Sequence, residues 1–251
     1  MPGTQTYSVL GCPCVAFPNA ASVKRVLRER VAEGLGGYSV AINAEKIQRF
    51  ERDEALRAVV GGAALPVADG AGAVIGLRVL HGARSAKIDL PRTLLETAHD
   101  EGWRVFVGGA SEEVNVGAAR TIASRHPGIA IVGRLNGYEP VERFIAAIAE
   151  ARPQVMLLAM GSPRQELVAA QIVEAVPNVF IVGCGGALDI LAGVKQRAPR
   201  FMVENNLEWL YRLYKEPSRW RRQLVLPQYM LRLLGEATRK RFGTTSRPHH
   251  R

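Results

Sequence analysis

Short runs of apolar residues alternate along this chain with longer segments in which apolar and polar residues recur at helical spacing. Most of the apolar runs are rich in β-branched residues and lack the alternation of half-exposed strands. Such runs are typical of strands that a parallel sheet buries on both faces. The predicted strands are residues 38–42, 65–68, 104–108, 129–132, 155–159 and 179–183. The predicted helices between them are residues 45–60, 90–101, 112–125, 141–151 and 165–176.

A repeated order of strand, helix and strand gives right-handed crossovers. It therefore predicts an α/β fold with a Rossmann-like, mostly parallel sheet flanked by helices. Ligands of such sheets bind beyond the carboxyl ends of the strands. After residue 183 the pattern changes to helical segments at 187–191, 200–216 and 218–242. We predict a Rossmann-like catalytic core over residues 1–193 and a basic helical appendage over residues 194–251.

Charge is distributed unevenly between these two parts. The net charge is +10, and residues 190–251 carry all of it, with 14 Lys and Arg against 4 Asp and Glu. The last predicted helix has apolar residues at helical spacing and basic residues on its other side, as expected of a helix that lies on an anionic membrane surface. Its apolar positions are Leu226, Tyr229, Met230, Leu233, Leu234 and Ala237. A basic tail of this kind could also bind nucleic acid.

Other features of the sequence narrow the class of protein. The longest apolar runs fall far below the roughly 18–20 residues that span a bilayer, and the amino-terminal residues do not resemble a signal peptide. Three cysteines, an odd number without paired-ligand spacing, are expected to be reduced thiols, although Cys12 and Cys14 could in principle form a redox or metal clip. We expect a cytoplasmic protein that associates peripherally with the inner face of the cytoplasmic membrane.

Two polar residues directly follow predicted strands. Asn43 ends one strand and begins a helix, so its side chain could cap that helix or could bind a nucleotide or a sugar. Asp69 is followed by glycines, so it could be a turn residue or a general base that a rigid strand holds above an open cleft. Spacing alone leaves both alternatives open.

Glycine-rich turns follow three other strands, and glycine lets a ligand approach the backbone closely, although tight turns use the same residues. The candidates for ligand contacts there are Gly108, Gly109, Gly137, Tyr138, Gly185 and Asp189. Residues 161–166 join a further strand to a helix, where Gln165 could face the cleft or the segment could simply cap the helix.

Arginines alternate with aromatic residues in the tail. Arg212, Arg219 and Arg222 could share one face and bind a diphosphate through bidentate hydrogen bonds, although a basic run is usually a solvated face. Trp209 and Trp220 lie among them and favour a surface with a binding partner.

Some chemistry is disfavoured by motifs that the sequence lacks. The first predicted strand is not followed by the dinucleotide-binding glycine pattern, and there is no P-loop, which lowers the case for an oxidoreductase or a nucleoside triphosphatase. An Asp-x-Asp motif for a metal-bound nucleotide diphosphate is also missing. Arginine, not a metal, is therefore the expected cation for a phosphate leaving group.

Read in order, these segments resemble the WecG/TagA/CpsF family of bacterial glycosyltransferases (glycosyltransferase family 26). The similarity runs from about residue 38 to residue 222. The matching residues are Ile42-Asn43-Ala44-Glu45-Lys46, Ala68-Asp69-Gly70, Val107-Gly108-Gly109, Gly137-Tyr138, Gly161-x-Pro163-x-Gln165-Glu166, Gly183-x-Gly185-Gly186-x-x-Asp189, Gly193, Arg197-Ala198-Pro199, Leu207-Glu208-Trp209-Leu210-Tyr211-Arg212 and Glu216-Pro217-x-Arg219. The chain departs from the family at Ala41, where Thr is common, and before Asp89, where the family usually has Thr-Gly.

The resemblance implies a metal-independent, inverting transfer of a sugar from a UDP-sugar to a polyprenyl-diphosphate-linked sugar, with N-acetylmannosamine or its uronic acid as the transferred group. Such reactions build teichoic acid linkage units or surface polysaccharide. It places the general base at Asp69, a donor contact at Asn43 and a pocket glutamine at Gln165. It also places the catalytic tail arginines at Arg212, Arg219 and Arg222. The expected partners are the UDP-sugar, the lipid-linked acceptor and the inner membrane leaflet, with a homo-oligomer also possible and no cofactor or metal.

Two alternatives to this hypothesis remain, one based on the basic tail and one on the Rossmann-like fold. A nucleic-acid-binding protein would use the tail for salt-sensitive binding and would respond little to UDP. A Rossmann-type, nucleotide-dependent oxidoreductase is the other alternative, and the missing glycine fingerprint counts against it.

Overall fold

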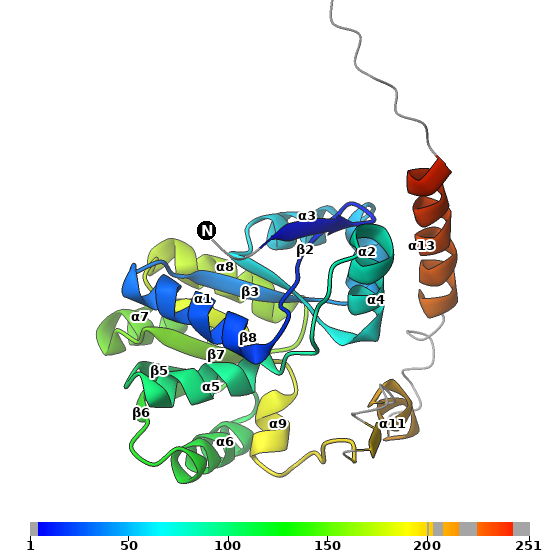
Figure 1. Cartoon of the computed structure of the whole chain (residues 1–251). Helices are drawn as coiled ribbons and strands as arrows, with labels where there is room; N and C mark the ends of the chain where they lie inside the picture. Colours follow the sequence, from blue (N-terminus) through cyan, green and yellow to red (C-terminus); the bar gives the residue numbers. More distant parts are fainter. Residues whose placement is uncertain (1–4, 200, 203–207, 216–224, 243–251) are drawn as a thin grey trace, which may run out of the picture.

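A single eight-stranded sheet runs through the computed structural model, which describes residues 5–199, 201–202, 208–215 and 225–242 (Figure 1). The strand order is β1-β2-β4-β3-β8-β7-β5-β6, and all pairs are parallel except the β1–β2 hairpin. The strands are β1 (Thr6–Val9), β2 (Cys12–Val15), β3 (Gly37–Ile42), β4 (Leu65–Ala68), β5 (Arg104–Gly109), β6 (Ala130–Leu135), β7 (Val155–Ala159) and β8 (Phe180–Gly183). The predicted α/β fold with a mostly parallel sheet is confirmed.

Helices cover both faces of this sheet and bury side chains that alternate along the strands. One face packs against α1 (Ala20–Ala32), α5 (Leu90–Asp100), α6 (Glu112–Arg125) and α9 (Ala187–Leu191). The opposite face packs against α2 (Ala44–Phe50), α3 (Glu54–Gly61), α4 (Gly70–His81), α7 (Val141–Ala151), α8 (Arg164–Ala175) and α13 (Val225–Phe242). In β7, for example, Met156 and Leu158 pack on the face that α8 covers, whereas Leu157 packs on the face that α5 covers. Successive side chains of a strand point to opposite faces of the sheet.

The six predicted strands are confirmed to within three residues at either end, and the helices α5 to α9 lie where the pattern predicts them. The single helix expected at 45–60 is instead α2 and α3, because Asp53 interrupts it and caps α3 by accepting a hydrogen bond from the Leu56 N–H at 3.0 Å. The pattern also missed the β1–β2 hairpin, α1 and α4. Of the two predicted tail helices, the structure describes α11 (Glu208–Lys215) and α13, while residues 203–207 and 216–224 lie outside the described parts.

The sequence predicts that the apolar face of α13 lies on a membrane surface, but in the structure this face packs against α2 and α4 (Figure 1). Tyr229 and Leu233 are completely buried, and the Tyr229 hydroxyl donates to the Gly72 carbonyl at 2.8 Å. Arg232 lies beside this apolar contact and bonds to Gln48 on α2 and to Glu51, the C-cap residue of that helix. The apolar stripe therefore packs on the core, and only its outlying Leu234, together with Leu231, remains exposed.

No helix among the described residues is long and apolar enough to span a bilayer. The boundary that we predict near residue 193, between core and appendage, stays a prediction.

Candidate functional site

A cleft of about 1550 Å³ opens beyond the carboxyl ends of four neighbouring strands. These are β4, β3, β8 and β7, in their order across the sheet. The segments that follow them contribute Asp69, Asn43, Gly185 and Gln165 to its lining. Four residues that the sequence singles out thus meet in one place, because parallel strands end on the same side of a sheet.

Asp69 projects from the end of β4 at the start of α4. Its backbone N–H donates to the Ile42 carbonyl at 2.8 Å, which fixes the residue to the end of β3. Asp69 occupies the N-cap position of α4, yet its carboxylate makes no capping hydrogen bond to that helix. The side chain is exposed and lines the cleft. Gly70 follows with a φ of 74°, so the turn that raises Asp69 above the cleft requires a glycine there.

Asn43 caps α2 and also lies in the lining of the cleft. Its Oδ1 accepts a hydrogen bond from the Lys46 N–H at 2.9 Å, so the helix-capping prediction is confirmed. The residue also lines the cleft, and its amide group can donate to a ligand from there.

Gln165 lies in the first turn of α8 and is only 7% exposed. Its Oε1 accepts from the Gly185 N–H at 3.1 Å, which ties α8 to the turn after β8. Position 183 requires glycine, because a Cβ there would lie 2.7 Å from Gln165 Nε2. The carboxamide is therefore held against the cleft wall. The N-cap residue of α8 is Pro163, which makes no side-chain hydrogen bond to the helix, so side-chain capping is not the role of this segment.

An ion pair that the sequence analysis missed lies beside these residues. Lys46 Nζ is 2.7 Å from Glu166 Oε1, and both side chains are nearly buried, with 12% and 2% exposed. The two residues are 120 positions apart, and the chain gives no local pattern that pairs them.

The other predicted ligand contacts do not lie in the cleft lining. Gly108 and Gly109 end β5, where a Cβ on Gly109 would lie 2.1 Å from the Ala159 carbonyl oxygen. Gly137 packs against Ala110 through a backbone hydrogen bond of 2.7 Å, and Tyr138 is 79% exposed. These glycines allow neighbouring backbones to approach one another, and a role in donor binding stays a prediction.

Asp189 also lies outside the cleft lining. It sits in the first turn of α9, and its carboxylate is 3.8 Å from Lys195 Nζ. Its carbonyl accepts from the N–H groups of Val194 and Lys195, so it shapes the chain where it leaves α9.

The tail reaches the cleft through α11, which adds Tyr211 and Lys215 to the lining. Arg212 belongs to the same helix, but the structure does not describe its side chain. Arg219 and Arg222 lie outside the described residues.

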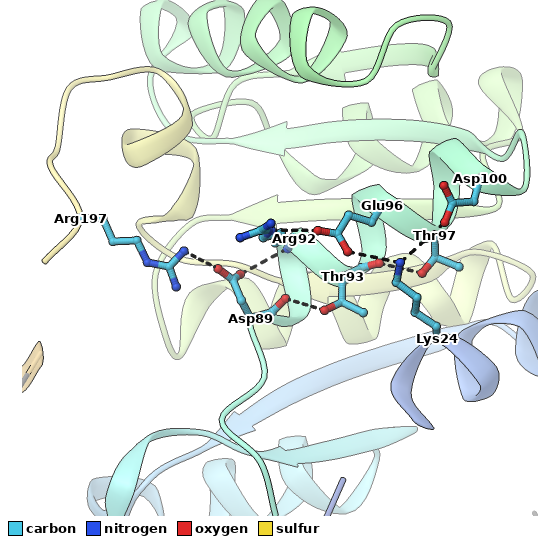
Figure 2. Close-up of polar contacts among 8 residues, drawn as sticks. All are labelled: Lys24, Asp89, Arg92, Thr93, Glu96, Thr97, Asp100 and Arg197. Atoms are coloured by element: carbon cyan, nitrogen blue, oxygen red, sulfur yellow. Dashed lines mark hydrogen bonds and ion pairs between the residues drawn. The ribbon is translucent and has the colours of Figure 1, made fainter. Parts of the chain in front are cut away.

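An ion pair at the cleft rim connects the core to the segment that leads to α11 (Figure 2). Asp89 caps α5 by accepting from the Arg92 N–H at 3.3 Å, and its Oδ2 is 2.7 Å from Arg197 Nη1. The side chain of Arg92 pairs in turn with Glu96 on α5, which lies 3.3 Å from Lys24 Nζ on α1. Arg197 lies near the start of the predicted appendage (residues 194–251), so this ion pair attaches the beginning of that segment to α5.

Basic and acidic side chains both line the cleft, with Lys and Arg somewhat more numerous than Asp and Glu. The described residues contain no group of three or more His, Cys, Asp or Glu that could hold a metal ion. The basic residues of the lining are Lys46, Arg49, Lys87, Arg92, Arg125, Lys195, Arg197 and Lys215.

Cys12 and Cys14 lie away from the cleft in β2, and burial raises the pKa of each thiol to about 12. Both cysteines are free, as expected of reduced thiols.

Comparison with known proteins decides what kind of cleft this is. The model of the glycosyl transferase WecG/TagA/CpsF family matches residues 7–243. The chain belongs to this family. An N-acetylglucosaminyldiphosphoundecaprenol N-acetyl-beta-D-mannosaminyltransferase of Bacillus subtilis (strain 168) is 30% identical over 241 residues, which is 94% of each chain. A protein of the same name from Bacillus spizizenii (strain ATCC 23059 / NRRL B-14472 / W23) is 32% identical over 219 residues, 86% of this chain and 83% of the relative.

The chain is thus a glycosyltransferase of the WecG/TagA/CpsF family, and the expected resemblance is confirmed. The motifs of that resemblance at Asn43, Asp69 and Gln165 converge in one cleft, as an active site requires.

Proposed function

We propose that this family member transfers N-acetylmannosamine, or its uronic acid, from a UDP-sugar to a polyprenyl-diphosphate-linked sugar. The observation that carries the proposal is the cleft in which Asp69 stands exposed beside Asn43 and Gln165. The names of the two Bacillus relatives support the acceptor class and the transferred sugar.

In the proposed reaction, Asp69 is the general base. Its carboxylate takes the proton of the acceptor hydroxyl while that oxygen attacks the anomeric carbon of the donor. The bond between the anomeric carbon and the diphosphate oxygen breaks, and UDP leaves with the bonding electrons. One displacement inverts the anomeric centre, so an α-linked donor gives a β-linked product. The word beta in the relatives' names is consistent with this stereochemistry.

The departing UDP gains negative charge on its diphosphate, and cations of the cleft and tail would stabilise it. Lys215 and Arg197 line the cleft, and Arg212 lies on α11 between the two cleft-lining residues of that helix. We propose that Arg212, Arg219 and Arg222 complete this cationic wall when donor is bound, and that no metal is needed.

A panel of UDP-sugars, tested with a short-chain lipid diphosphate N-acetylglucosamine acceptor in the presence of EDTA, examines this proposal. We expect acceptor-dependent UDP release with UDP-N-acetylmannosamine or its uronic acid, at a rate that EDTA changes by less than about twofold. Release that requires an added divalent cation would exclude the arginine-based mechanism.

We also propose that the tail holds the enzyme at an anionic membrane. Exposed apolar side chains gather on the tail, including Phe201, Tyr214 and Leu231, which are 61%, 79% and 72% exposed. The last turn of α13 carries Arg239, Lys240 and Arg241, and each basic residue near an acidic leaflet contributes about 1 kcal/mol.

Liposome flotation measures this association. We expect the protein to float with vesicles that contain acidic phospholipid and to stay in the dense fractions with neutral vesicles. The Leu231→Glu variant should weaken flotation, while Leu35→Glu should not, because Leu35 lies on a core loop before β3. Equal flotation with neutral and acidic vesicles would refute the electrostatic part of this proposal.

A further inference from the structure

The buried ion pair between Lys46 and Glu166 connects two helices that carry proposed active-site residues. Lys46 is in the first turn of α2, which Asn43 caps, and Glu166 is in the first turn of α8, directly after Gln165. Lys46 Nζ also donates to the Ala41 carbonyl at 3.0 Å, so two of the three ammonium hydrogens have partners at the end of β3 and on α8.

Stability alone does not account for this pair. Burying two charges costs desolvation energy that their attraction offsets only in part, and apolar residues of similar size often stabilise a protein as well or better. Glu166 adds to the cost, since its Oε2 is buried and has no hydrogen-bond partner among the described residues. The pair therefore calls for a role other than stability.

The side chains on either side of the ion pair indicate its role. On one side, the backbone N–H of Lys46 donates to Asn43 Oδ1, so a shift of the first turn of α2 would also displace the Asn43 amide. On the other side, Glu166 is covalently next to Gln165, whose Oε1 accepts from the Gly185 N–H. The connected groups follow β3, β7 and β8, which are neighbours in the sheet.

We propose that Lys46 and Glu166 are positioning residues that keep the amide of Asn43 and the carboxamide of Gln165 at a fixed separation in the cleft. They act through those two side chains and do not touch the substrate. This inference rests on the proposed function, because it takes the cleft to be the site of transfer.

Replacing both charges by apolar residues separates positioning from stability. In the Lys46→Met/Glu166→Leu variant we expect a melting temperature close to that of the wild type. The kcat/KM for transfer should be lower by roughly 10- to 100-fold, because small misplacements of active-site groups have effects of this size. The Glu166→Gln variant preserves the shape of the side chain and gives the same assay a second test if the double variant does not fold. Arg28→Met/Glu101→Leu is the control, because it removes an exposed ion pair on the other face of the sheet.

A double-mutant cycle with Asn43→Ala shows whether the pair acts through Asn43. If it does, Lys46→Met lowers kcat/KM by a clearly smaller factor in the Asn43→Ala background than in the wild type, where its effect on Gln165 and its effect on Asn43 act together. Wild-type activity in the apolar double variant, or effects of Asn43→Ala and Lys46→Met that simply multiply, would overturn the inference.

A readout without substrate separates this inference from the proposed function. In protein labelled with ¹⁵N at Asn and Gln, the side-chain amide signals of Asn43 and Gln165 should be well dispersed. Both should move towards the positions of exposed amides in Lys46→Met/Glu166→Leu. Unchanged signals in that variant would disprove the positioning role, whatever sugar the enzyme transfers.

Discussion

Replacing Asp69 by Asn is expected to abolish sugar transfer and to leave UDP binding nearly unchanged. The amide keeps the shape of the side chain but cannot take the proton of the acceptor hydroxyl, and general-base catalysis typically contributes 10²- to 10⁴-fold, so we expect kcat to fall by roughly that amount. The fold should be retained, because the Asp69 carboxylate does not cap α4. Single-turnover transfer and UDP titration by calorimetry measure the two effects separately.

Asp100→Asn is the matched control for this experiment. Asp100 pairs with Lys24 at 3.6 Å, at the far end of α5 from the cleft, and its replacement should leave both transfer and UDP binding unchanged. An Asp69→Asn variant with substantial transfer activity would remove Asp69 as the base.

Deleting the chain after Gly193 is expected to abolish transfer as well. The truncated protein loses Tyr211 and Lys215 from the cleft lining, and with them the three proposed catalytic arginines. It also loses α13, which uncovers the faces of α2 and α4 that Tyr229 and Leu233 bury. We therefore expect a folded sheet with a tendency to self-associate, which size-exclusion chromatography and circular dichroism would detect.

A shorter deletion, of residues 243–251 alone, serves as its control. It keeps α11 and α13 and should retain most of the transfer activity on a soluble acceptor. Full activity of the protein truncated after Gly193 would contradict the proposal that tail arginines complete the cationic wall of the cleft.

The sequence predicts the buried strands well and the glycine-rich helix poorly, for a physical reason. β7 was predicted with its observed bounds, because its five buried residues form an apolar run with clear ends. α4 begins Gly-Ala-Gly-Ala, which reads as a turn. Tertiary packing makes it a helix, since Gly72 lets Ala44 approach, and a Cβ at Gly76 would lie 2.4 Å from the Tyr229 hydroxyl oxygen.

In the candidate site, too, local sequence features were predicted and contacts that depend on tertiary packing were not. Asn43, Asp69 and Gln165 were predicted because each follows a strand, and strand ends are local features of the sequence. The Lys46–Glu166 pair was missed because it depends on the fold bringing the first turns of α2 and α8 together, which no local pattern encodes. The amphipathic pattern of α13 was seen correctly, but periodicity cannot distinguish a helix that packs on its own core from one that lies on a membrane.

The anomeric configuration of the transferred sugar tests the central claim most directly. The product of UDP-N-acetylmannosamine and a short-chain lipid diphosphate N-acetylglucosamine acceptor can be examined by NMR, through the one-bond carbon–proton coupling at the anomeric centre. A single displacement assisted by Asp69 predicts a purely β-linked product that disappears in the Asp69→Asn variant. An α-linked product, or a β-linked product that forms equally fast without the Asp69 carboxylate, would contradict it.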